Sequence, residues 1–410
     1  MQEAFASSVI AGLPVVATDK TAVLVDYTDF LLSDIHQISA SLAAQKQGSF
    51  KADSKRSGIY LPRSKAFERN TELEALVTYI GEKAGAFVRQ VTPSADAITV
   101  HLHHSLIALP KAGYQSREFH PYSGFWQVEY MDYASAFDTP MVKRLLPRHR
   151  LQKKHPEAEL SVAVEPIVYY LDPGVPEPVR SALIDGAMWW NTAFEQIGYK
   201  NAFQVKVLPE GADPMDVRYN VIQWVHRATR GWSYGAGVTD PRTGEIIKGH
   251  VTLGSLRVRQ DFLIATGLTA PFTGETADVS SQKAMALARI RQLSAHEVGH
   301  TLGLIHNFAG SANDRSTVMD YPHPKIDLEN GKISLEDAYR EGLGEWDNYA
   351  IAFGYGDFTA AERAQLVKQA KQQGLEYMAD QDARPAGGVS AIGHLWDNGS
   401  DAIAELNRLS

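Results

Sequence analysis

Hydrophobic and polar positions follow two different periods in the first part of the chain. Apolar residues spaced by three or four positions predict helices over residues 30–45 and 71–87. Runs in which apolar and polar residues alternate predict strands over residues 22–30 and 97–109. Together these elements predict an N-terminal α+β domain over residues 1–157.

The pattern becomes more regular after residue 157. A single apolar stripe predicts a helix over residues 176–197. Pro241 and Gly244 separate two strand-like runs and predict a hairpin over residues 235–253. Short β-branched and aromatic runs predict further strands over residues 162–170, 203–208 and 219–225. This order predicts a mixed sheet with a helix packed on it, in a second domain over residues 158–410.

A further amphipathic helix, predicted over residues 280–304, carries metal-binding residue types. His296 and His300 are four positions apart, so their imidazoles lie on one face of the helix. Gly303 can adopt a positive φ and end the helix. The chain can then turn back, which would bring His306 to the same metal ion.

The complete string is H-E-x-x-H-x-x-G-x-x-H, and its five fixed positions make a chance match rare. Three neutral imidazole nitrogens suit Zn²⁺ and leave a coordination position open, as in a catalytic zinc site. Glu297 follows the first histidine and points to the side where a reacting water would lie. The sequence therefore predicts one catalytic zinc ion held by His296, His300 and His306.

Length and composition exclude several other classes of protein. The 410 residues suffice for two or three domains, and 44% hydrophobic with 21% charged residues is typical of folded chains. A net charge of −8 argues against a nucleic-acid partner. The absence of cysteine excludes disulfides and thiolate metal sites, so a metal must be held by histidines and carboxylates. No apolar run is long enough to predict a membrane-spanning helix.

A methionine follows the zinc string at a characteristic distance. Met319 lies thirteen positions after His306, in the segment S-T-V-M-D-Y. With this segment the sequence resembles the metzincin clan of zinc endopeptidases, in which a tight turn containing methionine lies below the metal. The resemblance implies that role for Met319. It also implies that Tyr321 can bind zinc and swing to stabilise the oxyanion, as in astacin-like and serralysin-like metzincins.

Three more segments, residues 218–224, 235–251 and 344–356, resemble a bacterial family of large zinc-dependent metalloproteases. The catalytic domain of that family is similar to the metalloprotease-like subunit of a cholera-related AB5 toxin. The likeness implies an α+β fold with a mixed twisted sheet, an active-site helix and a small C-terminal subdomain from about residue 307. It also suggests that residues 249–254 form the edge strand that binds peptide.

Members of that family are generally longer and exported. The resemblance therefore implies a periplasmic, cell-surface or secreted protein, and a chain that is shortened at both ends. The first twenty residues lack the basic start of a signal peptide, since Glu3 precedes any lysine or arginine.

The sequence as a whole predicts a zinc metalloendopeptidase that acts on a peptide or protein substrate. Glu297 would pass a proton from water to the leaving amine, and Tyr321 would share the oxyanion charge with the metal.

The alternatives are a non-catalytic peptide-binding or toxin-like module of the same fold, and a glycan-binding surface protein. The N-terminal domain would support the enzyme, recruit substrate or act as a pro-region. His101 and His103 share one strand face, which leaves a second metal site as a further alternative.

Overall fold

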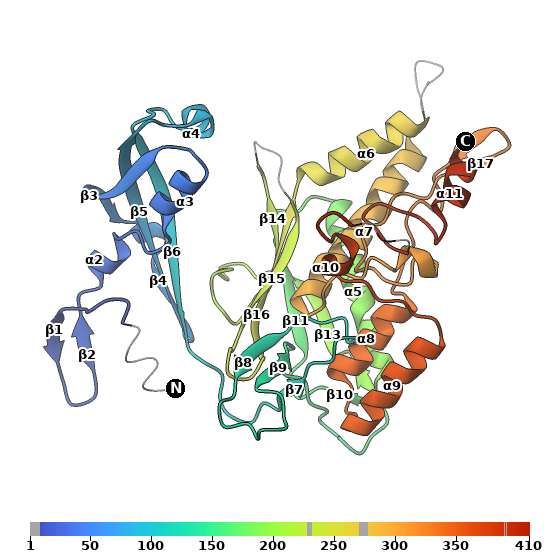
Figure 1. Ribbon diagram of the computed structural model, residues 1–410, viewed down its shortest axis with the longest axis horizontal. Helices are drawn as coiled ribbons and strands as arrows, with labels where there is room; N and C mark the ends of the chain where they lie inside the picture. Colours follow the sequence, from blue (N-terminus) through green and yellow to red (C-terminus); the bar gives the residue numbers. More distant parts are fainter. Residues whose placement is uncertain (1–8, 228–231, 270–277, 389, 391) are drawn as a thin grey trace. The chain divides into compact units, whose positions relative to one another are not determined.

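The computed structural model describes residues 9–227, 232–269, 278–388, 390 and 392–410 (Figure 1). The chain folds into two compact units. The smaller unit comprises Met1–Ala108 and Met215–Val217, and the larger comprises Leu109–Pro214 and Arg218–Ser410.

The segment from residue 109 to 157 packs with the larger unit. Phe125, Leu146 and Leu151 are all buried in the core of that unit. The boundary between the two compact units therefore lies after Ala108. The predicted domain boundary lies later, between residues 157 and 158, and the predicted domains stay a prediction.

The smaller unit is built on an antiparallel sheet in which β5 pairs with β3, β4 and β6. Its core includes Phe50, Val77, Tyr79 and Leu102. The predicted strand over residues 97–109 is confirmed as β6. The bounds are β1 (Val15–Thr18), β2 (Val23–Val25), α2 (Thr28–Leu31), α3 (Ile38–Ala44), β3 (Ser49–Ile59), η1 (Leu61–Arg63), β4 (Lys65–Ala66), β5 (Asn70–Glu82), α4 (Ala86–Val91) and β6 (Ala97–Ile107).

Two helix predictions in this unit need correction. The helix predicted over residues 71–87 is wrong, because β5 occupies most of that range. Its apolar residues cover both faces of a central strand, which mimics helical spacing. The helix predicted over residues 30–45 is confirmed only for α3, because the chain turns between α2 and α3.

The larger unit contains a five-stranded sheet in the order β13-β11-β14-β16-β15. The first four strands are parallel, and β15 is antiparallel to β16. The predicted helix over residues 176–197 is confirmed as α5 (Val179–Gln196), and the strand and hairpin predictions are confirmed as the sheet strands. Those strands are β11 (Ile167–Leu171), β13 (Phe203–Val207), β14 (Asn220–Val225), β15 (Tyr234–Thr239) and β16 (Ile246–Gly254).

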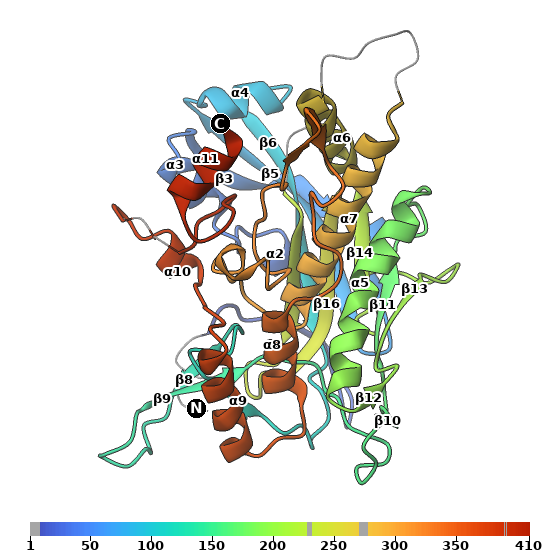
Figure 2. The ribbon, with the colours of Figure 1, turned by 90° about the vertical axis from the view of Figure 1, so that its right-hand side faces the viewer.

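Helices α5 and α7 (Ser280–Thr301) lie side by side against this sheet (Figure 2). The Trp190 indole N–H of α5 donates to the Ala295 carbonyl oxygen of α7 at 2.8 Å. At Gly186 a Cβ atom would lie only 2.0 Å from the Arg291 carbonyl oxygen, so the two helices approach closely there. This contact fixes α7, and with it the zinc string, against the core.

The prediction that residues 249–254 form the edge strand is wrong. They belong to β16, which pairs with β14 on one side and with β15 on the other. Among the described residues, the edge strand next to β16 is β15, the first strand of the hairpin. The hairpin was predictable from its turn, but which of its strands lies outermost depends on the long-range pairing of β16 with β14.

Among the described residues, no helix is long and apolar enough to cross a membrane. The other elements of the larger unit are short strands and helices outside this sheet. They are β7 (Arg117–Glu118), β8 (Val128–Met131), β9 (Val142–Leu146), β10 (Ser161–Val162), β12 (Tyr199–Lys200), α6 (Leu256–Thr269), η2 (Ser311–Asn313), β17 (Asp327–Glu329), β18 (Lys332–Ser334), α8 (Glu345–Tyr355), α9 (Ala360–Gln372), α10 (Asp380–Ala383) and α11 (Ala402–Leu409).

Candidate active site

The C-terminal end of α7 reverses the chain directly after the second histidine of the zinc string. Gly303 has a φ of +104°, a conformation that residues with a side chain rarely adopt. The N–H of Gly303 donates to the His300 carbonyl at 3.1 Å, and the N–H of Leu304 donates to the Gly299 carbonyl at 3.0 Å. This pair of bonds is a Schellman motif, which satisfies the last carbonyls of the helix and turns the chain towards His306.

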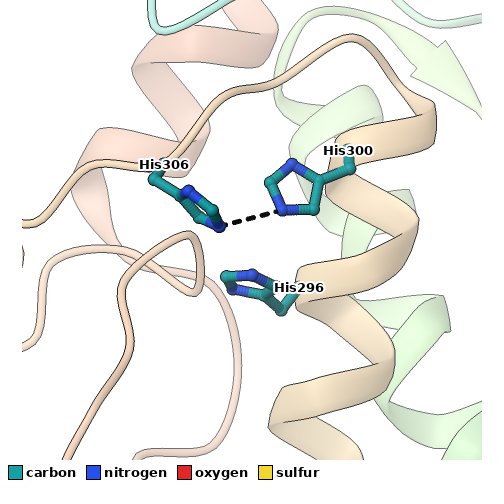
Figure 3. A group of neighbouring side chains, drawn as sticks. All are labelled: His296, His300 and His306. Atoms are coloured by element: carbon teal, nitrogen blue, oxygen red, sulfur yellow. Dashed lines mark hydrogen bonds between the residues drawn. The ribbon is translucent and has the colours of Figure 1, made fainter. Parts of the chain in front are cut away.

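The three histidines of the string converge (Figure 3). The Nε2 atoms of His300 and His306 are 3.2 Å apart, and one nitrogen from each of His296, His300 and His306 lies within 4.8 Å of the others. Among the described residues this is the one group of three such side chains that could hold a metal ion. The arrangement is compatible with zinc binding.

Each of these imidazoles is held by a hydrogen bond at its Nδ1 atom. Because the acceptors are carbonyl or carboxylate oxygens, Nδ1 carries the proton and Nε2 keeps its lone pair for a metal. The distances are 2.7 Å from His296 to the Val318 oxygen, 2.9 Å from His300 to the Leu304 oxygen and 2.7 Å from His306 to Asp380 Oδ2. Burial lowers the pKa of His296, and lowers that of His300 to about 4, which favours neutral imidazoles.

Met319 lies directly against α7. Its side chain is buried, and a Cβ atom added at Gly299 would lie 2.4 Å from Met319 Sδ. In the sequence, Gly299 lies between the first two histidines of the zinc string, immediately before His300. The helix therefore needs a glycine here so that the methionine can pack beneath the histidines.

A buried carboxylate that sequence reasoning missed fixes the turn around Met319. Asp347, at the start of α8, accepts hydrogen bonds from the Thr317 hydroxyl and from the backbone N–H groups of Val318 and Gly344, at 2.5, 2.9 and 2.9 Å. Burial raises the pKa of the Asp347 carboxyl to about 6. Because it follows Gly344 at the third helical position, Asp347 reads in the sequence as an ordinary helix-capping residue.

Glu297 and Tyr321 line a cavity of about 400 Å³. Glu297 is 5% exposed, and burial raises the pKa of its carboxyl to about 8, although a backbone hydrogen bond from Gly235 opposes this. The Tyr321 ring lies 4.6 Å from the His306 ring, centroid to centroid, and stacks on Trp396 at 5.4 Å. The structure thus brings the zinc string, Glu297 and Tyr321 together at one site.

Comparison with known families agrees with this geometry. Residues 278–409 match a family model described as Met-zincin. The C-terminal part of the chain therefore contains a metzincin-type domain. Residues 1–154 match a family model described as a domain of unknown function. No curated protein matches the chain.

The matched segment of the metzincin-type domain runs from α7 to α11, so it includes the three histidines and Met319. The whole five-stranded sheet against which α7 packs lies outside this match. The resemblance to a toxin subunit stays a prediction.

Asp380 is a second residue that the sequence did not reveal. It belongs to α10 of the metzincin-type domain, 74 positions after His306, and no local motif links the two.

We expect Asp380→Ala to weaken zinc binding about 10- to 100-fold, because the carboxylate orients the His306 imidazole and raises its basicity. Competition with a fluorescent chelator measures this affinity. Asp382→Ala, an exposed change in the same short helix, is the matched control, and equal affinities in the two variants would contradict the expectation.

The other histidine pair has carboxylate partners in the smaller unit. His101 Nδ1 lies 2.6 Å from Glu74 Oε1, and His103 bridges Glu74 and Glu72 at 2.8 and 2.6 Å. These contacts occupy both ring nitrogens of His103 and the Nδ1 atom of His101. Among the described residues, His101 and His103 do not belong to a group of three potential ligands.

Proposed function

We propose that the protein is a zinc-dependent endopeptidase that hydrolyses peptide bonds with Glu297 as general base. One observation supports this most strongly: three imidazoles direct their free Nε2 atoms at one point, next to a cavity lined by Glu297 and Tyr321. A purely structural zinc site has four protein ligands, whereas this group offers three.

The donor set fits Zn²⁺. His296, His300 and His306 would hold the ion through neutral nitrogens that are already oriented by their Nδ1 partners. When bound, zinc polarises the scissile carbonyl and makes water a stronger nucleophile at neutral pH.

The residues around the histidines supply the remaining functions. Glu297 takes a proton from the attacking water and gives it to the leaving amine, because it follows His296 directly and lines the cavity. Tyr321 donates its phenolic O–H to the oxyanion, since its ring lies against the His306 and His296 rings. Met319 supports the histidines from below.

The edge strand β15 gives the substrate a place to bind. One side of β15 pairs with β16. The backbone of Gly235, a residue of β15, donates a hydrogen bond to the Glu297 carboxylate, so the strand borders the site. A peptide in extended conformation would add by backbone hydrogen bonds to the other side of β15, which pairs with no strand among the described residues. We propose this strand as the substrate-binding edge in place of residues 249–254.

The resemblance to exported metalloproteases leads us to propose an exported protein. The smaller unit has its own core and sheet, and we propose that it supports the enzyme or recruits substrate. If limited proteolysis that removes this unit raises activity, the unit is a pro-region instead.

Zinc removal tests the proposed function directly. We expect the purified protein to cleave an unfolded protein substrate, to lose this activity when a chelator removes the metal, and to regain it when one equivalent of zinc is restored. Cleavage that persists in metal-free protein would contradict the proposal. If the protein binds one zinc ion and cleaves nothing, it is the non-catalytic binding module.

A further inference from the structure

One wall of the cavity is a stripe of α7. Arg289, Leu293 and Glu297 follow one another at intervals of four positions, and all three line the cavity. Arg289 therefore lies two helical turns, about 12 Å along the helix axis, before Glu297. A substrate side chain that entered the cavity beside Glu297 would extend along this stripe.

The Arg289 guanidinium is buried and bonds to no carboxylate among the described residues, although the charges of Asp261 and Glu297 partly oppose the effect of burial on its pKa. The residue is 4% exposed, and in the part of the chain that the structure describes it forms no ion pair. Its Nη1 donates to Gln292 Oε1, but its Nε has no hydrogen-bond partner among the described residues. The guanidinium carbon lies 5.5 Å from the centre of the Tyr339 ring. Burial lowers the pKa of Arg289, which reflects the unfavourable desolvation of this cation.

Two other arginines that line the cavity are already paired. Arg257 bonds to the buried carboxylate of Asp261 at 2.7 and 3.0 Å, and Arg384 pairs with Asp380. Arg227, the fourth arginine of the cavity lining, donates from Nη1 to the Trp232 carbonyl oxygen at 2.8 Å. Arg289 is therefore the buried arginine of the cavity wall that bonds to no carboxylate among the described residues and keeps an unbonded Nε.

We propose that Arg289 selects substrates that carry an acidic side chain, glutamate or aspartate, next to the cleaved bond. A guanidinium binds a carboxylate through short, charge-assisted hydrogen bonds, and it does so more strongly where water is excluded. The cavity of about 400 Å³ has room for such a side chain. This inference rests on the proposed function, because it assigns the chemistry of the substrate at the same site.

The test is the binding of matched peptides to the metal-free protein, which separates recognition from cleavage. The probes are acetylated alanine hexapeptides with one central Glu, Gln, Leu or Lys. Trp232 and Trp396 line the cavity, so tryptophan fluorescence reports occupancy. We expect the Glu peptide to bind about 10- to 100-fold more tightly than the isosteric Gln peptide, the size of effect of a hydrogen bond between charged groups.

Arg289→Met removes the charge but keeps an apolar chain of similar length, and it should equalise the affinities for the Glu and Gln peptides. Arg289→Lys restores a charge and should restore part of the preference. Arg291→Met changes the same helix outside the cavity and should leave the preference unchanged. If Arg289 acted only through Glu297, the ratio of Glu to Gln affinities would not change in any variant.

The same peptides joined to a fluorogenic group then test cleavage by the zinc-loaded protein. Equal affinities of the wild type for the Glu and Gln peptides, or no detectable binding of either, would overturn the role of Arg289 and leave the proposed endopeptidase standing if cleavage occurs. A clear preference for the Glu peptide without any zinc-dependent cleavage would uphold the role of Arg289 in recognition and overturn the proposed function.

Discussion

Glu297→Gln is expected to lower kcat about 10²- to 10⁴-fold while zinc binding stays intact. Glutamine has the same size as glutamate, and its amide oxygen can still accept the hydrogen bond from Gly235, so the fold around the site should persist. The amide cannot take a proton from water. Because the three converging imidazoles of the zinc string remain in place when Glu297 is changed, the metal should remain bound.

The measurement pairs cleavage of an unfolded protein substrate with zinc quantification in the same samples. Glu336→Gln makes the same chemical change at an exposed position of the larger unit and should leave both quantities unchanged. Near wild-type hydrolysis by Glu297→Gln would reject Glu297 as the base. Loss of zinc from this variant would instead place the carboxyl among the metal ligands.

Gly303→Ala is expected to lower the free energy of unfolding of the larger unit by about 2–5 kcal/mol. Part of this effect, about 1–2 kcal/mol, comes from a Cβ atom at a φ of +104°. The rest, about 1–3 kcal/mol, comes from steric overlap, because that Cβ atom would lie 2.2 Å from the Pro147 carbonyl oxygen and 2.9 Å from the Phe125 ring. A shifted helix end would also move His306 away from the other two imidazoles.

Gly342→Ala is the matched control, since Gly342 has a φ of +82° but no atom within 4 Å of the added Cβ. The difference between the two variants isolates the steric overlap from the backbone strain. All seven tryptophans lie in the larger unit, so urea denaturation followed by tryptophan fluorescence reports that unit alone. The denaturation should be measured on metal-free protein, so that a change in zinc affinity does not alter the measured free energy of unfolding. Equal losses in the two variants would show that the approach to Pro147 is unimportant.

The zinc string was predictable because its geometry is local. The i, i+4 spacing of His296 and His300 needs only a helix, and the positive φ of Gly303 needs only that the helix end there. The matched family model supports the same metzincin-type domain. The roles of Glu297 and Tyr321 stay predictions until the variants are measured.

The residues that hold this local motif in place were not predictable. Asp380 reaches His306 across 74 positions, and Asp347 fixes the turn around Met319 from the start of another helix. Arg289 looks like one of several charged residues on an amphipathic helix until the cavity shows which face it occupies. Each of these features depends on segments that are far apart in the sequence, and no periodicity of the sequence links them.

The sequence by itself determined the features that depend on neighbours along the chain: helix α5, the hairpin of β15 and β16, and the convergence of three histidines around one helix end. The tertiary structure decided that residues 70–82 form a central strand, that β15 lies at the sheet edge, and which charges meet in the cavity. The physical reason is that the geometry of a helix or a turn depends on residues that are close in the sequence. Strand order and the pairing of buried charges depend instead on contacts between distant segments, and the periodicity of the sequence does not reveal the free energies of those contacts.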